Sequence, residues 1–194
     1  ILGEIKKRCR VFIFMSVGER SLDCYKRMKE AGASGALLRF ETSNEAIYNA
    51  IHPGQSFRQR IELLKGMKEM GYYVASGFLV GLPGQTVEDI ADDILFTKSM
   101  GVNMVTVGPF VPCKGTPLAL HPQGSAEMTL KVTAVSRLLM QRAKIPVTTA
   151  LETIESEEGR RLGLSSGANS LMFNLTPERY RDDYRIYPNK YHGN

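Results

Sequence analysis

Short apolar segments alternate with amphipathic segments along the whole chain. The apolar segments end at glycine, proline or polar residues, which is typical of buried parallel strands. The amphipathic segments repeat apolar residues at helical spacing, as Ile61, Leu64 and Met67 do. The pattern predicts six strands, at residues 11–17, 36–41, 73–80, 104–110, 147–151 and 170–175. It predicts helices at residues 21–30, 57–70, 87–100, 129–140 and 155–162.

Each predicted strand but the last is followed by a predicted helix, so the chain is a series of βα units. Right-handed βα units build either a closed barrel or an open doubly wound sheet. Polar residues, glycine or proline stand at the end of every predicted strand, and the strand ends of a barrel meet at one mouth. An open sheet would concentrate such residues at one switch point. We therefore predict an α/β fold of the (βα)8 TIM-type barrel, of which residues 1–194 cover roughly strands 3 to 8.

Composition narrows the range of functions. The 194 residues make one domain or part of one, and the apolar content of 43% is enough for a core. The net charge of +5 includes no Lys/Arg run of the kind found in nucleic-acid-binding arms, so no nucleic-acid partner is expected. No apolar run approaches the roughly 20 residues of a membrane span, and no signal peptide is visible. No membrane association is expected.

The cysteines and the first residues give two further expectations. Cys9, Cys24 and Cys113 are far apart and form no metal-binding pattern, so no metal ligands are predicted in this chain. An odd, sparse set of cysteines indicates free thiols in a reducing cytoplasm, each expected to be a small buried side chain. The chain begins without methionine, with residues typical of the later part of an amphipathic helix. We therefore expect a fragment of a longer protein.

The most informative local pattern is the segment 77–86, GFLVGLPGQT, in which an apolar strand enters a glycine-rich turn. The turn leads into a helix with Thr86, Glu88 and Asp89 near its start. Glycine allows a sharp bend or a close approach to the main chain, and the start of a helix has unpaired N–H groups. We expect a corner at which a ligand comes near the backbone.

A charged pair stands at the end of the second predicted strand. Arg39 and Glu41 alternate with Phe40, so both side chains point to the same face of the strand. They are either a structural ion pair at the barrel rim or a pair that holds a polar ligand, for which the fixed donor fork of arginine is suited. Arg60 follows in the next helix, near Arg58, and spacing alone leaves a solvated helix face as the alternative to a functional role.

Other polar residues give weaker indications. Thr148 and Thr149 end a predicted strand, so one hydroxyl can face the barrel interior, although threonine also favours strands for its own sake. The three histidines have no metal-ligand spacing and are expected at the surface. The Tyr- and Arg-rich segment 179–191 could stack on nucleotides, but a segment that covers one end of the barrel fits it better.

Seven short motifs occur in an order that resembles a known family. They are residues 37–44 (LLRFETSN), 79–86 (LVGLPGQT), 108–112 (GPFVP), 148–150 (TTA), 167–169 (GAN), 174–177 (NLTP) and 187–188 (YP). The series is similar to the radical S-adenosylmethionine (SAM) enzymes of the biotin synthase group, above all to the HydE type of [FeFe]-hydrogenase maturase, with the methylornithine synthase PylB as a near relative. The resemblance covers essentially the whole chain, and the ordered series is specific although each motif alone is not.

The resemblance implies a barrel with SAM in its mouth and a [4Fe-4S] cluster bound by a CxxxCxxC loop. Reductive cleavage of SAM then gives methionine and a 5′-deoxyadenosyl radical, which in HydE-like enzymes acts on a small sulfur-bearing or metal-bound substrate. By position, Glu41 and Arg60 resemble the residues that hold the methionine part of SAM, and Leu79 and Val111 resemble apolar contacts beside it. The resemblance implies that the substrate-side anion pocket is lined by Arg39, Thr148, Thr149 and Tyr187.

The departure from the family pattern is the missing CxxxCxxC. The cluster ligands are therefore expected in an N-terminal part outside this chain, and the chain alone is expected to be inactive. The implied function is HydE-like radical chemistry in H-cluster maturation, in the cytoplasm, on a small-molecule substrate and with other hydrogenase maturation proteins as candidate partners.

Three alternatives stay open. The first is a biotin synthase or methylornithine synthase activity, because these enzymes share the barrel and the SAM walls. The second is a non-catalytic truncated module that binds SAM or an anion. The third, another (βα)8 enzyme such as an aldolase, needs a strand-end lysine for a Schiff base, and no strand end offers one clearly.

Overall fold

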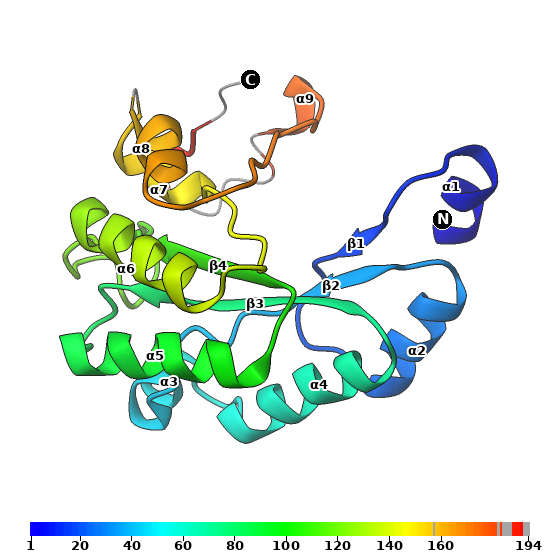
Figure 1. Ribbon diagram of the computed structural model, residues 1–194, viewed down its shortest axis with the longest axis horizontal. Coiled ribbons are helices and arrows are strands. Elements are labelled where there is room, and N and C mark those ends of the chain that lie inside the picture. Colours follow the sequence, from blue (N-terminus) through cyan, green and yellow to red (C-terminus); the bar gives the residue numbers. More distant parts are fainter. Residues whose placement is uncertain (157, 182, 184–187, 192–194) are drawn as a thin grey trace.

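A parallel sheet forms the centre of the molecule (Figure 1). The computed structural model describes residues 1–156, 158–181, 183 and 188–191. The four strands of the sheet are β1 (Phe14–Met15), β2 (Gly35–Leu37), β3 (Tyr73–Val80) and β4 (Met104–Pro109). They lie in the order β1-β2-β3-β4, and each neighbouring pair is parallel.

Two extended segments continue this order beyond β4. Lys144 forms a parallel bridge with Met104, and Pro146 forms one with Ser170. Six segments therefore lie side by side in the order of the sequence, without the reversal that marks a doubly wound sheet. This arrangement agrees with the predicted part of a (βα)8 barrel.

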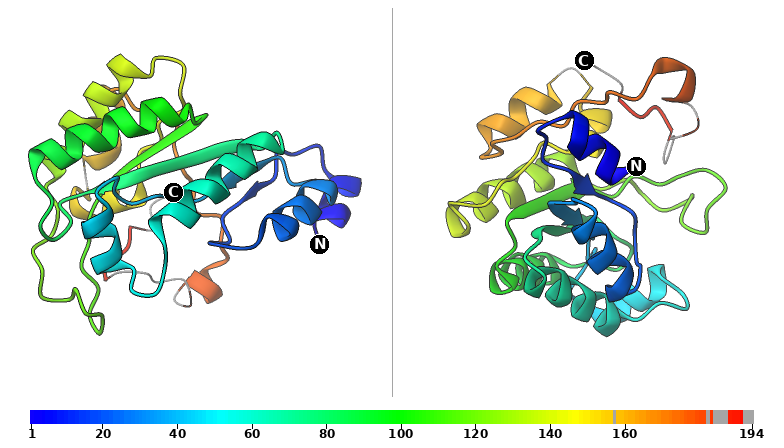
Figure 2. Two further views of the ribbon diagram at one scale, coloured as in Figure 1. Left: turned by 90° about the horizontal axis from the view of Figure 1, so that it is seen from below. Right: turned by 90° about the vertical axis from the view of Figure 1, so that its right-hand side faces the viewer.

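Helices cover the sheet mainly from one side (Figures 1 and 2). Their bounds are α1 (Leu2–Arg8), α2 (Leu22–Glu30), α3 (Glu45–Ile51), α4 (Phe57–Glu69), α5 (Val87–Met100), α6 (Ala126–Leu139), α7 (Thr149–Ile154), α8 (Gly159–Ser165) and α9 (Glu178–Arg181). Helices α2, α4 and α5 follow one face, whereas the segment that carries α7 to α9 lies on the opposite side. The main hydrophobic core fills the space between the sheet and the helices, with Phe40, Met67 and Phe78 fully buried. In the part of the chain that the structure describes, no helix is long and apolar enough to span a membrane.

Local signals explain why the predicted long helices form where they do. Ser21, Ser56 and Ser125 cap α2, α4 and α6 through their hydroxyl groups. A capping box between Thr86 and Asp89 starts α5, and Gly101 ends it in the left-handed conformation, with φ of 55°.

The predictions for the C-terminal part need correction. Residues 147–151 do not form a strand: Thr148 is the N-cap of α7, and its hydroxyl accepts a hydrogen bond from the Leu151 N–H. The two threonines suggested a strand because of their β-propensity, but a threonine hydroxyl also caps helices well. Of the predicted strand 170–175, Ser170 alone forms a bridge. The helix predicted at 155–162 is α8, which begins at Gly159.

Helix α3 was not predicted, and the first two strands are shorter than predicted. Asn44 caps α3 by accepting hydrogen bonds from the Ala46 and Ile47 N–H groups. The helix has only two turns, too few for a clear apolar repeat. It brings the Tyr48 ring against the Arg60 guanidinium and the His52 ring against Tyr48, which matters for the site described below.

One buried carboxylate joins the loops that follow β2 and β3. Asp93, on α5, is 0% exposed, and its Oδ1 accepts hydrogen bonds from the Ser43 N–H, from Ser43 Oγ at 2.7 Å and from Thr42 Oγ1 at 3.3 Å. Its Oδ2 accepts one from Gln85 Nε2 at 3.0 Å. Burial raises the pKa of this carboxyl above its usual value, although the four donors oppose the shift. A single side chain thus fixes both loops relative to α5.

Removing this carboxylate should destabilise the fold strongly. In D93A the donors of Thr42, Ser43 and Gln85 lose their acceptor, and each unsatisfied buried donor costs about 1–3 kcal/mol. We expect D93A to lower the free energy of unfolding by about 3 kcal/mol or more, measured by urea unfolding followed with circular dichroism. The neighbouring Asp92 is exposed, so D92A serves as control and should stay within about 0.5 kcal/mol of the unmodified protein. Equal losses in the two variants would contradict the role given to Asp93.

Candidate functional site

The structure brings three of the predicted site residues together at the carboxyl end of β2. Arg39 Nε lies 3.2 Å from Glu41 Oε2, and these side chains are 20% and 18% exposed. Arg60, on α4, donates a hydrogen bond from Nη1 to the Arg39 backbone carbonyl at 3.0 Å. The ion pair between Arg39 and Glu41 is therefore present, as expected both for a structural pair and for a ligand-binding pair, and Arg60 is hydrogen-bonded to the Arg39 backbone.

Glu41 has an unusual backbone conformation. Its φ is 68°, a left-handed value that residues other than glycine seldom adopt. Hydrogen bonds to β3 hold it there, since its N–H donates to the Gly77 carbonyl at 3.1 Å and its carbonyl accepts from the Leu79 N–H at 2.9 Å. Strain of this kind costs about 1–3 kcal/mol and is found preferentially at ligand sites.

Arg60 is buried, so the alternative of a solvated helix face is wrong for this residue. Its side chain is 8% exposed, and its Nε donates to Glu19 Oε1 at 2.6 Å. Nη2 donates to Gln55 Oε1 at 2.6 Å, and the guanidinium lies 5.2 Å from the centre of the Tyr48 ring. A guanidinium has five N–H groups, so two remain beyond the three hydrogen bonds that Arg60 donates to described residues, one on each terminal nitrogen.

Unpaired buried polar atoms concentrate at this place. Among the described residues, eight buried side-chain atoms lack a hydrogen-bond partner, and four of them are Arg39 Nε, Glu41 Oε2, Tyr48 Oη and His52 Nε2. Arg39 Nε and Glu41 Oε2 are within ion-pair distance but are not aligned for a hydrogen bond. Because buried polar atoms normally have partners, such a cluster indicates a place where a ligand completes the hydrogen bonding.

Burial also shifts the ionisation of Tyr48, on α3, and of His52, the residue that caps the C-terminal end of α3. Burial raises the pKa of Tyr48 and lowers the pKa of His52, so both side chains favour their neutral forms. The Arg60 guanidinium opposes the shift at Tyr48 and adds to it at His52. His52 was expected at the surface, but it is half-buried against Tyr48, with ring centres 4.7 Å apart. His121 is exposed as expected, and His192 lies outside the described residues.

The chemistry of this group fits the amino-acid part of SAM. A zwitterion needs an acceptor for its ammonium group and donors for its carboxylate. Glu41 Oε2, although in ion-pair contact with Arg39, accepts no hydrogen bond from the described residues, and Arg60 has N–H groups left to donate. The charges of Arg39 and Arg60 are matched by Glu41 and Glu19, so a zwitterion enters without adding net charge.

The glycine-rich corner after β3 differs from what the sequence suggested. Gln85 Oε1 accepts hydrogen bonds from the N–H groups of Gly81 at 2.8 Å and Leu82 at 3.2 Å, so these donors are not free for a ligand. The close neighbour of Gly81, which has φ of 88°, is the backbone of Gly124. The glycine allows two backbone segments to approach each other. At the start of α5, the Asp89 N–H donates to the Thr86 side chain in the capping box and is not free for a ligand either.

Leu79 and Val111 lie at the ends of adjacent strands. Leu79 is half-buried and packs in a small cluster with Ile47 and Phe110, and its N–H contacts Glu41 as described. Val111 is half-buried directly after Phe110. Leu79 is thus in contact with the charged group through Glu41, and the contacts of Leu79 and Val111 with SAM stay predictions.

The predicted substrate-side residues are placed less completely. Thr148 is 9% exposed and lies against Gly108, where an added Cβ would come within 3.0 Å of its Oγ1. This position is near the carboxyl end of β4. Thr149 begins α7 and lines a small cavity with Glu152 and Asn174. Tyr187 lies outside the described residues, so a joint pocket with Arg39 remains a prediction.

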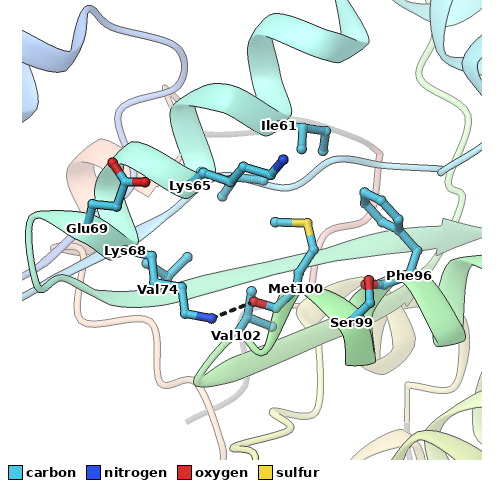
Figure 3. Close-up of a pocket in the computed structure, with 10 residues that line it drawn as sticks. Ile61, Lys65, Lys68, Glu69, Val74, Phe96, Ser99, Met100 and Val102 are labelled. Carbon is cyan, nitrogen blue, oxygen red and sulfur yellow. Dashed lines mark hydrogen bonds between the residues drawn. The ribbon is translucent and has the colours of Figure 1, made fainter.

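A separate cavity lies outside the sheet, between α4 and α5 (Figure 3). It is lined by Lys65, Met100 and Val102, among others, and Lys68 Nζ bridges the two helices by donating to the Met100 carbonyl at 2.9 Å. The predicted site residues do not line this cavity. It is therefore unrelated to the charged group at the end of β2.

The cysteines agree only in part with the predictions. All three are free, but Cys9 is exposed and Cys24 and Cys113 are half-buried, so none is the buried thiol that was expected. Within the described ranges, no group of three or more His, Cys, Asp or Glu side chains could hold a metal ion. These residues consequently do not fit a [4Fe-4S] cluster, which agrees with the absence of CxxxCxxC from the sequence.

Sequence reasoning missed the residues that support the site. In the sequence Glu19 is only one of the polar residues that follow predicted strands, and no pattern marks Gln55 or Tyr48. Glu19 lies 41 positions from Arg60 and Asp93 lies 50 positions from Ser43, and one sequence gives no signal that such pairs meet. For Asp93 the sequence gives one indication, an aspartate at a position of the amphipathic helix where an apolar residue is expected.

Comparison with known proteins gives a consistent result. The profile of the Radical SAM superfamily matches residues 1–97, half of the chain. The [FeFe] hydrogenase maturase subunit HydE of Thermotoga maritima is 44% identical over 98% of this chain and 54% of its own length. A biotin synthase of Clostridium botulinum is 30% identical over 86% of this chain and 51% of its own length. The crystal structure of methylornithine synthase (PylB) superposes with a TM-score of 0.83 at 30% identity, over 91% of this chain and 51% of that one.

The chain thus spans about half the length of the relatives it matches. The family resemblance drawn from the seven motifs is confirmed, and so is the barrel-type fold. The chain belongs to the radical SAM superfamily, whose cofactors are SAM and a [4Fe-4S] cluster.

Proposed function

We propose that this chain forms the larger part of the barrel of a HydE-like radical SAM enzyme, which acts on a small-molecule substrate in [FeFe]-hydrogenase maturation. The observation that carries the proposal is the 44% identity to HydE over nearly the whole chain. We propose other maturation proteins as its partners. Three free cysteines support the reducing cytoplasm as its compartment.

The chain's own residues would hold SAM at the carboxyl end of β2. Glu41 accepts hydrogen bonds from the ammonium group, and the two remaining N–H groups of Arg60 donate to the carboxylate. Leu79 and Val111 provide apolar contacts beside the cofactor. When bound and given one electron by the reduced cluster, SAM would supply carbon-radical chemistry to the substrate, with methionine as the leaving group. The substrate-side residues in this proposal are Arg39, Thr148, Thr149 and Tyr187.

The cluster is held, in this proposal, by residues outside 1–194. The described residues offer no suitable group of ligands, and the relatives are about twice as long as this chain. A non-catalytic module that binds SAM or an anion is the contrasting case. The gene sequence upstream of Ile1 separates the two, because a CxxxCxxC there supports the enzyme and a nearby start codon supports the module.

A methylornithine synthase is the second candidate within the family. The TM-score of 0.83 to PylB favours it. HydE has the higher sequence identity over more of the chain, so we rank HydE-like activity first. Neighbouring genes for hydrogenase maturation would support this ranking.

The proposed activity can be measured directly. We expect the full-length protein, with its cluster reconstituted under anaerobic conditions, to show iron–sulfur absorbance and to release 5′-deoxyadenosine and methionine from SAM after reduction. Chromatography of the quenched reaction measures both products. A protein that incorporates iron and sulfide but forms no deoxyadenosine would overturn the proposal.

The strained backbone of Glu41 allows stability to be separated from binding. Glycine adopts φ of 68° without strain. It has more conformational freedom in the unfolded state, however, and the loss of this freedom on folding costs about 0.5–1 kcal/mol. We expect E41G to lower the free energy of unfolding by no more than about 3 kcal/mol, because relief of the backbone strain offsets part of the loss of the Arg39 counter-charge, and to weaken SAM binding at least about tenfold, because the ammonium group loses its acceptor. Urea unfolding and isothermal titration calorimetry give the two numbers. Unchanged affinity for SAM would exclude Glu41 from the site.

A further inference from the structure

Glu19 is the carboxylate that accompanies the buried Arg60. We propose that Glu19 is a positioning residue, which holds the Arg60 guanidinium in the orientation that binds the carboxylate of SAM. This inference rests on the proposed function. It concerns a residue of the loop between β1 and α2, which is distant in sequence from the other groups of the site.

The contact itself is short and largely buried on the arginine side. Arg60 Nε lies 2.6 Å from Glu19 Oε1, with side-chain exposures of 8% for Arg60 and 31% for Glu19. The other two acceptors of Arg60, the Arg39 carbonyl and Gln55 Oε1, are uncharged. Within the described residues, Glu19 is therefore the one carboxylate bonded to this guanidinium. A buried charge without its counter-charge is strongly unfavourable.

The three hydrogen bonds come from different segments and determine the plane of the guanidinium. Nε points to the β1–α2 loop, Nη1 to the end of β2, and Nη2 to the loop before α4. Bidentate binding of a carboxylate depends on this plane, because the donor fork of arginine is rigid. Without Glu19 the Nε side of the fork loses its anchor, and the remaining N–H groups lose their fixed direction.

The loop that carries Glu19 is itself well anchored. Gly18 has φ of 70°, and its carbonyl accepts a hydrogen bond from the fully buried Tyr25 hydroxyl at 2.7 Å. The Tyr25 carbonyl in turn accepts one from the Tyr72 hydroxyl at 2.7 Å. Glu19 is thus presented from a rigid base, as a residue that orients another side chain must be.

The chain provides a contrasting pair on the same helix. Arg58 Nε lies 3.3 Å from Glu62 Oε1, but these side chains are 86% and 61% exposed. Exposed pairs of this type contribute little to stability or orientation. Glu62 is therefore a matched control for the loss of a carboxylate partnered with arginine.

The test compares a ligand that has the amino-acid carboxylate with one that lacks it. S-adenosylhomocysteine and 5′-deoxyadenosine are titrated into the full-length protein with its cluster, and their affinities are measured by calorimetry. We expect E19A to weaken S-adenosylhomocysteine binding by about tenfold or more and to leave 5′-deoxyadenosine binding within about twofold. We expect E19Q, whose amide oxygen still accepts from Arg60 Nε, to stay within about threefold for both ligands. E62Q should change neither affinity.

Two further outcomes keep the inference apart from a purely structural role. If E19A lowers the melting temperature and weakens both ligands equally, Glu19 only stabilises the fold and the inference is wrong. If E19A fails to fold, E19D combined with R60K decides, because the shorter side chain withdraws the carboxylate from Arg60 Nε: losses of S-adenosylhomocysteine affinity that add in the double variant would show that Glu19 does not act through Arg60. Retained ligand selectivity in E19A would also overturn the inference.

The proposed function fails by a different result. It fails if the unmodified protein does not cleave SAM, whatever the Glu19 variants do. The inference about Glu19 fails if the unmodified protein cleaves SAM and prefers S-adenosylhomocysteine to 5′-deoxyadenosine, while E19A keeps that preference. The two failures can therefore be distinguished in one set of measurements.

Discussion

The buried carboxylate of Asp93 determines how the two most important loops of this barrel face each other. Thr42 and Ser43 follow directly after Glu41, so the hydrogen bonds to Asp93 restrain the chain at the point where Glu41 is in the left-handed conformation. Gln85 binds the same carboxylate from the β3 corner. Burial disfavours the ionised form of this carboxyl, while its four donors favour it. Removal of the carboxylate would leave these donors without an acceptor, and removal of the donors would leave a buried carboxylate without hydrogen bonds. The geometry of the site thus depends on a residue that cannot touch the ligand.

The charged residues of the site are arranged as two linked pairs. Arg39 and Glu41 form the pair at the strand end, and Arg60 and Glu19 form the pair behind it, joined through the Arg39 carbonyl. Buried ion pairs rarely stabilise a fold by themselves, because desolvation offsets much of the attraction. Their position beside buried polar atoms that lack hydrogen bonds therefore favours a role in ligand binding over a role in stability. A zwitterionic ligand would complete the hydrogen bonds while leaving the charge balanced.

The sequence was sufficient to predict the long regular elements and the family, but not the partners within the site. Helices α2, α4 and α5 have clear caps and apolar repeats, and the apolar segments of β3 and β4 are unambiguous. Thr148 was wrongly assigned to a strand, because threonine is common both in strands and at helix N-caps. The pairing of Arg60 with Glu19 depends on how β1 and β2 are placed in the sheet, so no local pattern contains it. Periodicity predicts faces and ends of elements, whereas contacts between loops require the tertiary structure.

The glycine-rich corner shows why a family motif need not be a ligand site. Its backbone donors are taken by Gln85, and its tight conformation accommodates the backbone of Gly124. The motif therefore joins two loops at the barrel mouth, and Gln85 connects it to Asp93 and to the Leu79 carbonyl. Glu41 and Arg39 belong to another motif of the same series, yet each retains a buried polar atom without a hydrogen-bond partner. Four of the eight unsatisfied buried atoms of the described residues lie together at Arg39, Glu41, Tyr48 and His52, and this gathering of unsatisfied atoms, rather than membership of a motif, favours the end of β2 as the ligand site.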